Sequence, residues 1–585
     1  REERPDLDAA YMAAVQAMIG SGGWPLTVFL TPQLRPFYGG TYFPHDRFLK
    51  TIQAVAEQFQ NARQKLESQA ALVAAHIAEA APNVASPALD DAAVQAQVRV
   101  ALEAMDTKWG GFRGQTKFPT PIRWTFLLDA YRKWGQPDVA RALRRTLDAM
   151  AEGGLHDAIG GGFFRYATEP TWAIPHFEKM LYDNAQLASL YLQAAAVFGE
   201  PRYRAIGLDT LDFLLQEMLT PEQAFGASFD ADAAGREGTT YLFTLADFTS
   251  LFAQSACRDA ARLLGVTDKP NFAGASVPAL QLSTPADAAL WNRCRAPLLE
   301  ARRKRPQPAF DAKLVTAWNG LAIAALARGY RASGQMRYRE AAEHAASAIW
   351  RLAHDESGAL TRSARGNGTA APAILDDYAF LASGYAELFQ ANADLEALQH
   401  ALELVRQANA HFKDPKGGWF LSDDSTAAPL GRRSETYDGV EPTGAAVLIA
   451  DLRTLGTLTG DEALLEAADA ALSSYAAAMR QHGTDMAGFL DAALLALGPY
   501  RDVVIVGSGD ALPRAYDRLL PSFASAVVLP SSARARELES ALPTLDGKHD
   551  EGGRALAYVC ERGTCQAPTS DPATFERELR AGWLH

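Results

Sequence analysis

Cysteine is scarce in this chain, with four in 585 residues, at Cys257, Cys294, Cys560 and Cys565. So few cysteines cannot hold together a disulfide scaffold of this size, and such scarcity is typical of proteins in a reducing compartment. The last two have no second pair and no nearby histidine, so the sequence favours free thiols over a zinc site. We therefore expect a cytoplasmic protein without a metal or another cofactor, and without dithiol oxidoreductase activity.

Long apolar runs and an excess of positive charge are also missing. Hydrophobic residues make up 48% of the chain, yet no run reaches the roughly eighteen residues that a membrane-spanning helix needs. The 56 Lys and Arg residues against 69 Asp and Glu residues give a net charge of −13, the wrong sign for neutralising nucleic-acid phosphates. We expect neither a membrane nor a nucleic acid as a partner, and the length favours several structural units.

Glycine-aromatic turns recur along the chain and separate helical stretches. They lie at Gly110–Phe112, Gly161–Phe163, Gly226–Phe229, Gly358–Leu360, Gly417–Phe420 and Gly488–Phe489. After the third turn the spacing is lengthened by an insertion from about Thr244 to Pro308. Six repeats of a helix pair and a turn predict an (α/α)6 toroid with its turns at one rim, in preference to an open helical solenoid.

Strand-like segments precede this helical region. Trp24 to Pro32 is rich in β-forming residues, and a second strand is expected at Gly40 to Phe43. A cis Trp24–Pro25 bond is compatible with the first of these strands. A helical apolar stripe then runs from Phe48 to about Ala81, before a linker from Pro82 to Pro87.

The pattern changes again after Gly498. Apolar β-forming runs predict buried strands, with a helix between the first two, at Val503–Gly507, Ala526–Pro530 and Ala555–Cys560. Such a succession is typical of a small α/β unit. The sequence therefore predicts three units, at residues 1–82, 88–498 and 499–585.

The segment from Gly153 to Leu187 carries more potential chemistry than any other part of the chain. A triple-glycine turn at Gly160–Gly162 leads to a predicted short hairpin, and Pro175 is expected to begin a helix that continues to Val197. In such a helix His176, Lys179 and Asp183 share one stripe, and Glu178 and Tyr182 form a second stripe beside it.

Two interpretations of these stripes are open. A solvated helix face with a Lys179–Asp183 ion pair is one of them. A ligand cavity is the other, and we favour it because aromatic residues crowd the same turns and because Asp183 is a poor residue for the middle of a helix. We predict catalytic roles for His176, Glu178 and Asp183, and ligand contacts from His156, Arg165, Trp172 and Tyr182.

Other repeats contribute further candidates. Asp230 and Asp232 lie in an extended loop, which is an ordinary acidic loop or a ligand contact, and the EF-hand pattern is absent. Asp376 is interpreted as a helix N-cap, which leaves Asp377 as a fourth catalytic candidate. Further ligand contacts are predicted from Trp318, Asn319, Tyr378 and Glu441, with a helix cap as the alternative for Asn319.

Several motifs carry a family resemblance. REERPD, GSGGWPLTVFLTP and GGTYFP closely resemble the thioredoxin-like domain of the spermatogenesis-associated, thioredoxin-domain-containing proteins. LHDAIGG, PHFEKMLYDNA, DAKLVTAWNGLAIAALA, LDDYAF and DGVEPTG are similar to motifs of the same family, so the resemblance extends over nearly the whole chain. It implies that the chain starts inside the thioredoxin-like domain, after the family's Cys-x-x-Cys region, and that Gly23–Pro25 occupies the position of the thioredoxin cis-proline.

The expected fold is therefore mainly α, an (α/α)6 toroid between a partial thioredoxin-like domain and a small α/β unit. Such toroids resemble six-hairpin glycosidases and the N-acylglucosamine epimerase group, which implies a carbohydrate-like small molecule processed by acid/base chemistry. Hydrolysis would use two carboxyl groups, whereas epimerisation would use a pair such as His156 and His176. The alternative is a non-catalytic or redox-linked accessory protein with a degenerate sugar-binding toroid. The oligomeric state is left open.

Overall fold

Six inner helices form a closed ring at the centre of the molecule. The computed structural model describes residues 2–78, 87–252, 256–354, 358–364 and 371–584. Each inner helix contacts the next, and the last packs against the first. In chain order they are α5 (Pro121–Trp134), α7 (Leu181–Phe198), α12 (Thr316–Ser333), α14 (Leu375–Asn392), α16 (Gly444–Thr459) and α18 (Ala487–Leu497).

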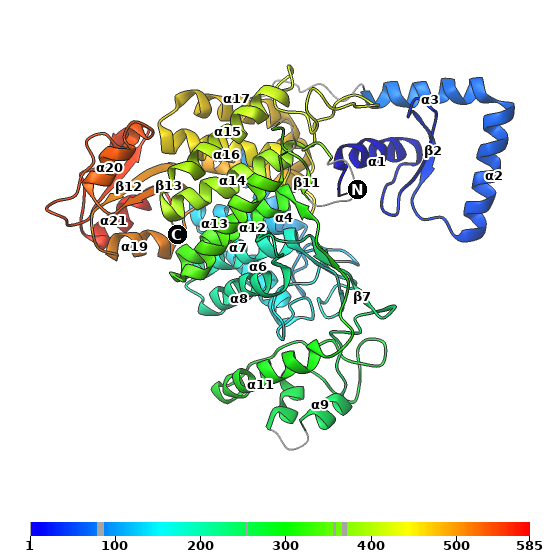
Figure 1. Cartoon of the computed structure of the whole chain (residues 1–585), viewed down its shortest axis with the longest axis horizontal. Coiled ribbons are helices and arrows are strands. Elements are labelled where there is room, and N and C mark those ends of the chain that lie inside the picture. The colour runs from blue at the N-terminus through cyan, green and yellow to red at the C-terminus, as the bar shows by residue number, and fades with distance from the viewer. Residues whose placement is uncertain (1, 79–86, 253–255, 355–357, 365–370, 585) are drawn as a thin grey trace.

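An outer helix precedes each inner helix. These are α4 (Asp91–Glu103), α6 (Pro137–Glu152), α8 (Pro201–Phe213), α13 (Met336–Leu352), α15 (Leu395–His411) and α17 (Glu462–His482). A π-helical turn, η1 (Leu214–Met218), extends α8, and a 3₁₀ turn, η3 (Gly483–Met486), connects α17 to α18. The predicted (α/α)6 toroid is confirmed, and it occupies the middle of Figure 1.

The predicted turns before α5, α7, α12, α14 and α16 lie at one rim of the ring, which we call the turn rim. In three of them an aspartate precedes two glycines of positive φ, as in Asp157, Gly161 and Gly162. The backbone of Asp157 accepts from the N–H of Gly161 and donates to the carbonyl of Gly162. The sixth prediction was wrong, because Gly488–Phe489 lies inside α18 and the connection is η3.

The opposite rim has much shorter connections. Each inner helix from α5 to α16 ends in a left-handed residue, at Gly135, Gly199, Gly334, Ala393 and Gly460, and the next outer helix follows almost at once. Glycine suits these positions because it reaches positive φ without strain. We call this side the short-loop rim.

The N-terminal unit stands beside the ring (Figure 1, blue). It contains α1 (Pro5–Ile19), the antiparallel hairpin of β1 (Thr27–Leu30) and β2 (Pro36–Gly40), α2 (His45–Asn61) and α3 (Arg63–Ala78). The Trp24–Pro25 bond is cis. The second strand lies earlier than predicted, and the single predicted helix is two helices. Apart from Pro87, the predicted linker lies outside the described residues.

The insertion forms a helical lobe below the ring in Figure 1. Its helices are α9 (Leu245–Leu251), η2 (Ala256–Asp259), α10 (Ala260–Leu263) and α11 (Pro285–Arg303), and they share a small apolar core. Short strands line the turn rim above it: β3 (Tyr166–Ala167), β4 (Pro175–His176), β5 (Lys179–Met180), β6 (Ser228–Phe229), β7 (Asp232–Ala233), β8 (Arg236–Glu237), β9 (Phe310–Asp311), β10 (Leu314–Val315) and β11 (Ser363–Ala364).

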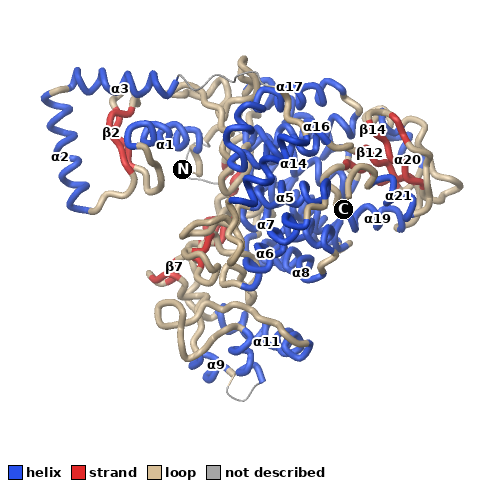
Figure 2. The backbone as a smooth tube through the Cα atoms, turned by 180° about the vertical axis from the view of Figure 1, so that it is seen from behind, coloured by secondary structure: helices blue, strands red, loops and turns tan. Residues whose placement is uncertain are grey.

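The C-terminal unit is the predicted α/β structure. Its sheet has the order β13-β12-β14-β15, with β12 parallel to β13 and antiparallel to β14, and its strands lie beside the ring helices in Figure 2. The strands are β12 (Arg501–Val506), β13 (Ala524–Leu529), β14 (Leu556–Glu561) and β15 (Thr564–Cys565), and the helices are α19 (Ala511–Leu519), α20 (Ser532–Leu538), η4 (Pro543–Leu545) and α21 (Pro572–Leu579).

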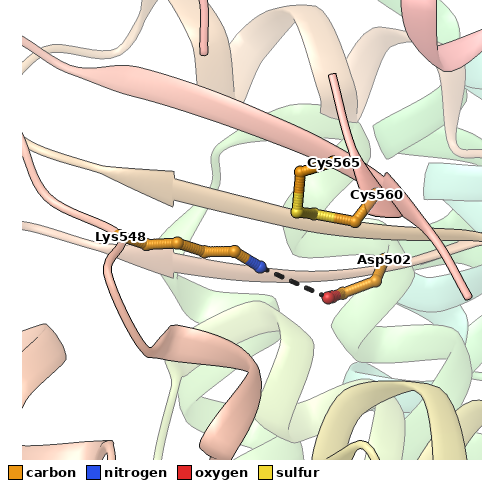
Figure 3. The surroundings of a disulfide bond; sticks show 4 residues. All are labelled: Asp502, Lys548, Cys560 and Cys565. Carbon is orange, nitrogen blue, oxygen red and sulfur yellow. Dashed lines mark hydrogen bonds and ion pairs between the residues drawn. A yellow bond between two sulfur atoms is a disulfide. The ribbon is translucent and has the colours of Figure 1, made fainter. Parts of the chain in front are cut away.

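The prediction of free thiols was wrong. Cys560 and Cys565 are register partners on β14 and β15 and form a disulfide (Figure 3), and a second disulfide joins Cys257 of η2 to Cys294 of α11. The second pair is 37 residues apart in the chain, so only folding brings its thiols together. Because all four cysteines form disulfides, their scarcity no longer supports a reducing compartment. The cytoplasmic location stays a prediction. None of the described helices is both long enough and apolar enough to cross a membrane.

Candidate functional site

The segment before α7 is folded differently from the prediction. Pro175–His176 and Lys179–Met180 are the short strands β4 and β5, and the helix begins only at Leu181. Strand pairing overrides the local helical pattern, because β4 pairs with the nearby β3 and β5 pairs with the distant β6. Asp183 is consequently the third residue of the helix, where the N-terminal dipole favours a carboxyl group, and it does not share a helical stripe with His176.

A group of polar and aromatic side chains nevertheless meets at the turn rim. We call it the rim cluster, and its members are Arg165, His176, Glu178, Tyr182, Asp183, Trp318 and Glu441. Its ionic part is centred on Glu178, whose Oε2 accepts from Arg165 Nη1 at 2.6 Å and lies 3.4 Å from His176 Nε2. His176 Nδ1 is 2.7 Å from Glu237 Oε1 on β8. Arg165 Nε also donates to the Tyr182 hydroxyl at 3.2 Å.

These partners keep Glu178 and His176 charged. Burial opposes the ionisation of Glu178, but hydrogen bonds from His176 and Arg165 outweigh it and lower the pKa of Glu178 to about 2. The hydrogen bond to Glu178 raises the pKa of His176 above its ordinary value. One corner of the rim cluster is therefore an ionised carboxylate held between two cations.

The other corner holds carboxyl groups that stay protonated. Asp183 is fully buried, and neither of its side-chain oxygens has a hydrogen-bond partner. Burial raises the pKa of Asp183 well above its ordinary value; the charge of Arg165 opposes this shift, and the charges of Glu441 and Glu178 add to it. A buried carboxyl group without any partner is unusual in a folded protein, and it marks Asp183 as a candidate contact for a polar ligand.

Glu441 is the second protonated group. Its Oε2 accepts from Trp318 Nε1 at 2.8 Å, and burial raises its pKa to about 8. The Trp318 ring meets the ring of Tyr182 edge to face, with centroids 4.9 Å apart. The aromatic pair thereby connects Glu441 to the helix turn that carries Asp183.

Asp376 is not the predicted N-cap of α14, and Asp377, predicted as catalytic, stabilises the start of that helix. The N-cap of α14 is Ile374, and Asp377 ties the helix start together by accepting from the backbone N–H of Ile374. Its other oxygen accepts from the N–H of Ala317 and from Arg362 Nη1, so Asp377 joins α12 to α14. Asp376 accepts from the N–H of Gly444, and burial raises its pKa to about 7.

Asn319 acts as a clamp. Its side chain accepts from the N–H of Phe225 and donates to the carbonyls of Phe225 and Val315. Asn184 makes the same three bonds to Phe163 and Met180. Both asparagines fix a glycine-aromatic turn to the start of an inner helix, which explains why asparagine stands there despite its low helix propensity.

Three other predicted ligand contacts lie away from the rim cluster. The buried Trp172 donates its Nε1–H to the carbonyl of Trp109. His156 Nε2 lies 3.7 Å from Asp209 Oδ2, and none of the contacts that the structure describes for it is with His176. Tyr378 is buried, and its ring packs against Phe412.

The acidic loop is placed at the edge of the cluster. Asp230 and Asp232 are exposed, and Asp230 accepts from the N–H of Asp232. The same β7–β8 hairpin delivers Glu237 to His176. The sequence analysis missed Glu237 and also Arg362, since neither lies in a motif with recognisable spacing. Within the described residues no group of three or more histidine, cysteine or acidic side chains is arranged to hold a metal ion.

A cavity lies inside the ring beneath the rim cluster. Its volume is about 240 Å³, and residues of all six inner helices line it. At its upper end Gln186 donates to the carbonyls of Tyr182 and Val440. This places the cavity one helical turn below Asp183.

The protonated rim carboxyls predict a pH-dependent stability. The pKa of Glu441 is about 8 in the folded chain against an ordinary 4.5. Between these two pH values the folded chain keeps a proton on Glu441 that the unfolded chain has lost, so the free energy of unfolding falls as the pH rises. Glu441→Gln keeps an acceptor for Trp318 and removes the proton. We expect the unfolding free energy of the variant to fall less steeply between these pH values, by up to about 1.4 kcal/mol per pH unit.

Denaturant unfolding at intervals across this pH window measures the difference. Glu237→Gln is the matched control, because this partly exposed residue lies at the same rim. Parallel profiles for the wild type and Glu441→Gln would show that Glu441 ionises normally in the folded chain.

This chain is similar to several known proteins. A family model described as Thioredox_DsbH, "Protein of unknown function, DUF255", matches residues 1–78. Human spermatogenesis-associated protein 20 is 30% identical, and the alignment covers 99% of this chain and 82% of the human protein. The rat protein of the same name is 29% identical with the same coverage. Among solved structures, a D-mannose isomerase gives a TM-score of 0.43 at 13% identity, over 67% of this chain and 88% of that one.

Proposed function

This chain belongs to the spermatogenesis-associated protein 20 family, and from that premise we propose that its rim cluster binds a small carbohydrate-like molecule and processes it by acid/base chemistry. One observation carries the proposal. Two carboxyl groups of the rim cluster have opposite surroundings: Asp183 is buried without a hydrogen-bond partner, which raises its pKa, whereas Glu178 pairs with Arg165 and His176, which lower its pKa. Paired groups whose environments drive their pKa values apart are the usual source of acid and base roles in an active site.

The proposed roles follow from the partners of each group. Asp183 has no partner in the protein, so its proton is available to a ligand oxygen. Glu178 is held between Arg165 and His176 and supplies fixed negative charge close to any positive charge that develops on the ligand. Hydroxyl groups suit this site because they can accept from a protonated carboxyl and donate to an ionised one.

Asp183→Asn tests the proposal. The amide is nearly isosteric but cannot transfer a proton, so turnover of a processed sugar is expected to fall at least about 100-fold while the fold is kept. The assay incubates the protein with a panel of monosaccharides and oligosaccharides and follows products by mass spectrometry and binding by thermal shift.

Asp148→Asn is the matched control, since Asp148 accepts from the Tyr203 hydroxyl on the outer helices, away from the rim cluster. It is expected to leave turnover unchanged. If Asp183→Asn lowers the melting temperature and leaves ligand handling intact, Asp183 is a structural clamp and the proposal fails. A wild type that neither binds nor changes any sugar of the panel also contradicts it.

A further inference from the structure

The lower half of the ring cavity holds a second set of buried polar groups that the rim cluster does not use. They come from the middle and C-terminal turns of the inner helices and line the cavity wall: Asp129, Gln193, Arg328, Arg331, Glu387, Asp451, Arg453 and Asp491. The floor belongs to the C-terminal unit, through residues 520–522 and Ala524. Ser522 donates to Asp129, and Gln390 of α14 accepts from the N–H of Ala526 on β13.

Two aspartates in this wall interact with each other. Asp129 Oδ2 and Asp491 Oδ1 are both buried and have no hydrogen-bond partner. Burial, followed by the charge of Asp129, raises the pKa of Asp491 well above its ordinary value. The other oxygen of Asp129 accepts from Arg132 and Ser522.

Three further groups have unused hydrogen-bonding capacity. Gln193 Oε1, Asp451 Oδ2 and Arg331 Nη2 are buried without a partner, and all three residues line the cavity. Burial also raises the pKa of Asp451 well above its ordinary value, so its carboxyl group can donate as well as accept. Unsatisfied groups of this kind are rare in an ordinary core, because each one costs free energy.

The charges in the wall are balanced. Arg328 pairs with Glu387, Arg331 pairs with Glu387 and Asp517, Arg132 pairs with Asp129, and Arg453 pairs with Asp469. An ionic ligand would therefore find no uncompensated partner charge. A neutral molecule with hydroxyl groups would satisfy both the free acceptors and the free donors.

We propose that the lower half of the ring cavity is a second ligand site, which binds a neutral small molecule bearing several hydroxyl groups. Gln193, Asp451 and Arg331 contact the ligand, and the Asp129–Asp491 pair forms the adjoining wall. The C-terminal unit completes the site, so ligand binding also stabilises the seating of that unit against the ring. This site goes beyond the proposed function of the rim cluster and does not depend on it.

The experiment titrates the full chain with D-glucose, D-mannose and myo-inositol as neutral probes, and with D-gluconate and D-glucose 6-phosphate as charged ones. Isothermal titration calorimetry measures affinity, and hydrogen exchange locates protection. At least one neutral probe is expected to bind more tightly than about 10 mM. Protection is expected in the C-terminal halves of α7 and α16 and in residues 517–526.

Gln193→Leu removes the free acceptor and should weaken this binding at least about tenfold. It should not destabilise the fold, since an unsatisfied buried amide is replaced by an apolar group of similar size. Gln64→Leu on the exposed face of α3 is the matched control and should bind as the wild type does. Asp183→Asn should also retain binding here, which separates this site from the rim cluster.

Three outcomes overturn the inference. The first is that no neutral probe binds, and the second is that only the charged probes bind. The third is that the protection maps to the rim cluster and disappears in Asp183→Asn while Gln193→Leu retains it. In that third case the cavity is an accessory space of the rim site.

Discussion

Gly320→Ala is expected to cost more than about 3 kcal/mol of unfolding free energy and to disrupt the ring where two inner helices lie closest. A Cβ atom on Gly320 of α12 would lie 2.3 Å from the carbonyl oxygen of Phe380 on α14. Gly384 of α14 faces the same contact, since its Cβ would lie 2.8 Å from the carbonyl oxygen of Gly320. The neighbours are backbone atoms of packed helices, which cannot turn aside as a flexible side chain can.

Denaturant unfolding of the full chain, followed by far-UV circular dichroism, measures this effect. Gly439→Ala is the matched control, because its Cβ would meet only the ring of Tyr437 at 3.5 Å, which is an ordinary contact. The control should unfold with the wild type. A Gly320→Ala protein whose unfolding free energy also lies within about 0.5 kcal/mol of the wild type would show that α12 and α14 can separate without cost.

Asp157→Asn is expected to cost about 3 to 5 kcal/mol, because it leaves two buried cations without a counter-charge. Both oxygens of Asp157 lie within 2.8 Å of Arg302 Nη1, and Oδ2 also accepts from Lys179 Nζ at 2.7 Å. All three side chains are buried. Asp157 belongs to the turn before α7, Lys179 to β5 and Arg302 to α11, so this group joins the insertion lobe to the turn rim.

Disruption of this ionic group should loosen the insertion lobe in addition to lowering the overall stability. Limited proteolysis should cut Asp157→Asn within residues 245–303 earlier than the wild type, and the melting temperature should fall. Glu300→Gln on the same helix is the matched control, because its ion pair with Lys304 is exposed and such pairs contribute little. Equal behaviour of the two variants would mean that the lobe is held by its apolar contacts alone.

The rim cluster was only partly predictable from the sequence. The motif from Gly153 to Leu187 identified Arg165, His176, Glu178, Tyr182 and Asp183, because polar residues that fit poorly into a helix stood beside glycines and aromatic residues. Its expected helix was wrong, since β4 pairs with the nearby β3 and β5 pairs with β6, and the second of these pairings cannot be detected in a local window. Lys179, considered as a partner of Asp183, pairs with Asp157.

The alternatives at the other candidates depended on hydrogen-bond partners that are distant in the chain. Asn319 serves the backbone of Phe225, and Asp377 serves the backbone of Ala317. Each side chain accepts a hydrogen bond from the backbone of a turn or of a helix start, so its oxygen already has a partner within the protein. Local spacing cannot distinguish such a structural side chain from a ligand contact. For that reason the sequence favoured Asp377 over Asp376 as the catalytic candidate.

The sequence by itself determined the repeat of six helix pairs, five of their glycine-aromatic turns and the strands of the C-terminal unit, because helical periodicity and apolar β-forming runs are local properties of the chain. Only the tertiary structure decided which carboxyl groups are charged, which cysteines pair, and where the ring encloses polar groups without partners. Those properties depend on burial and on atoms contributed by distant segments. Asp129 and Asp491, from the first and last inner helices, become neighbours only because the ring closes.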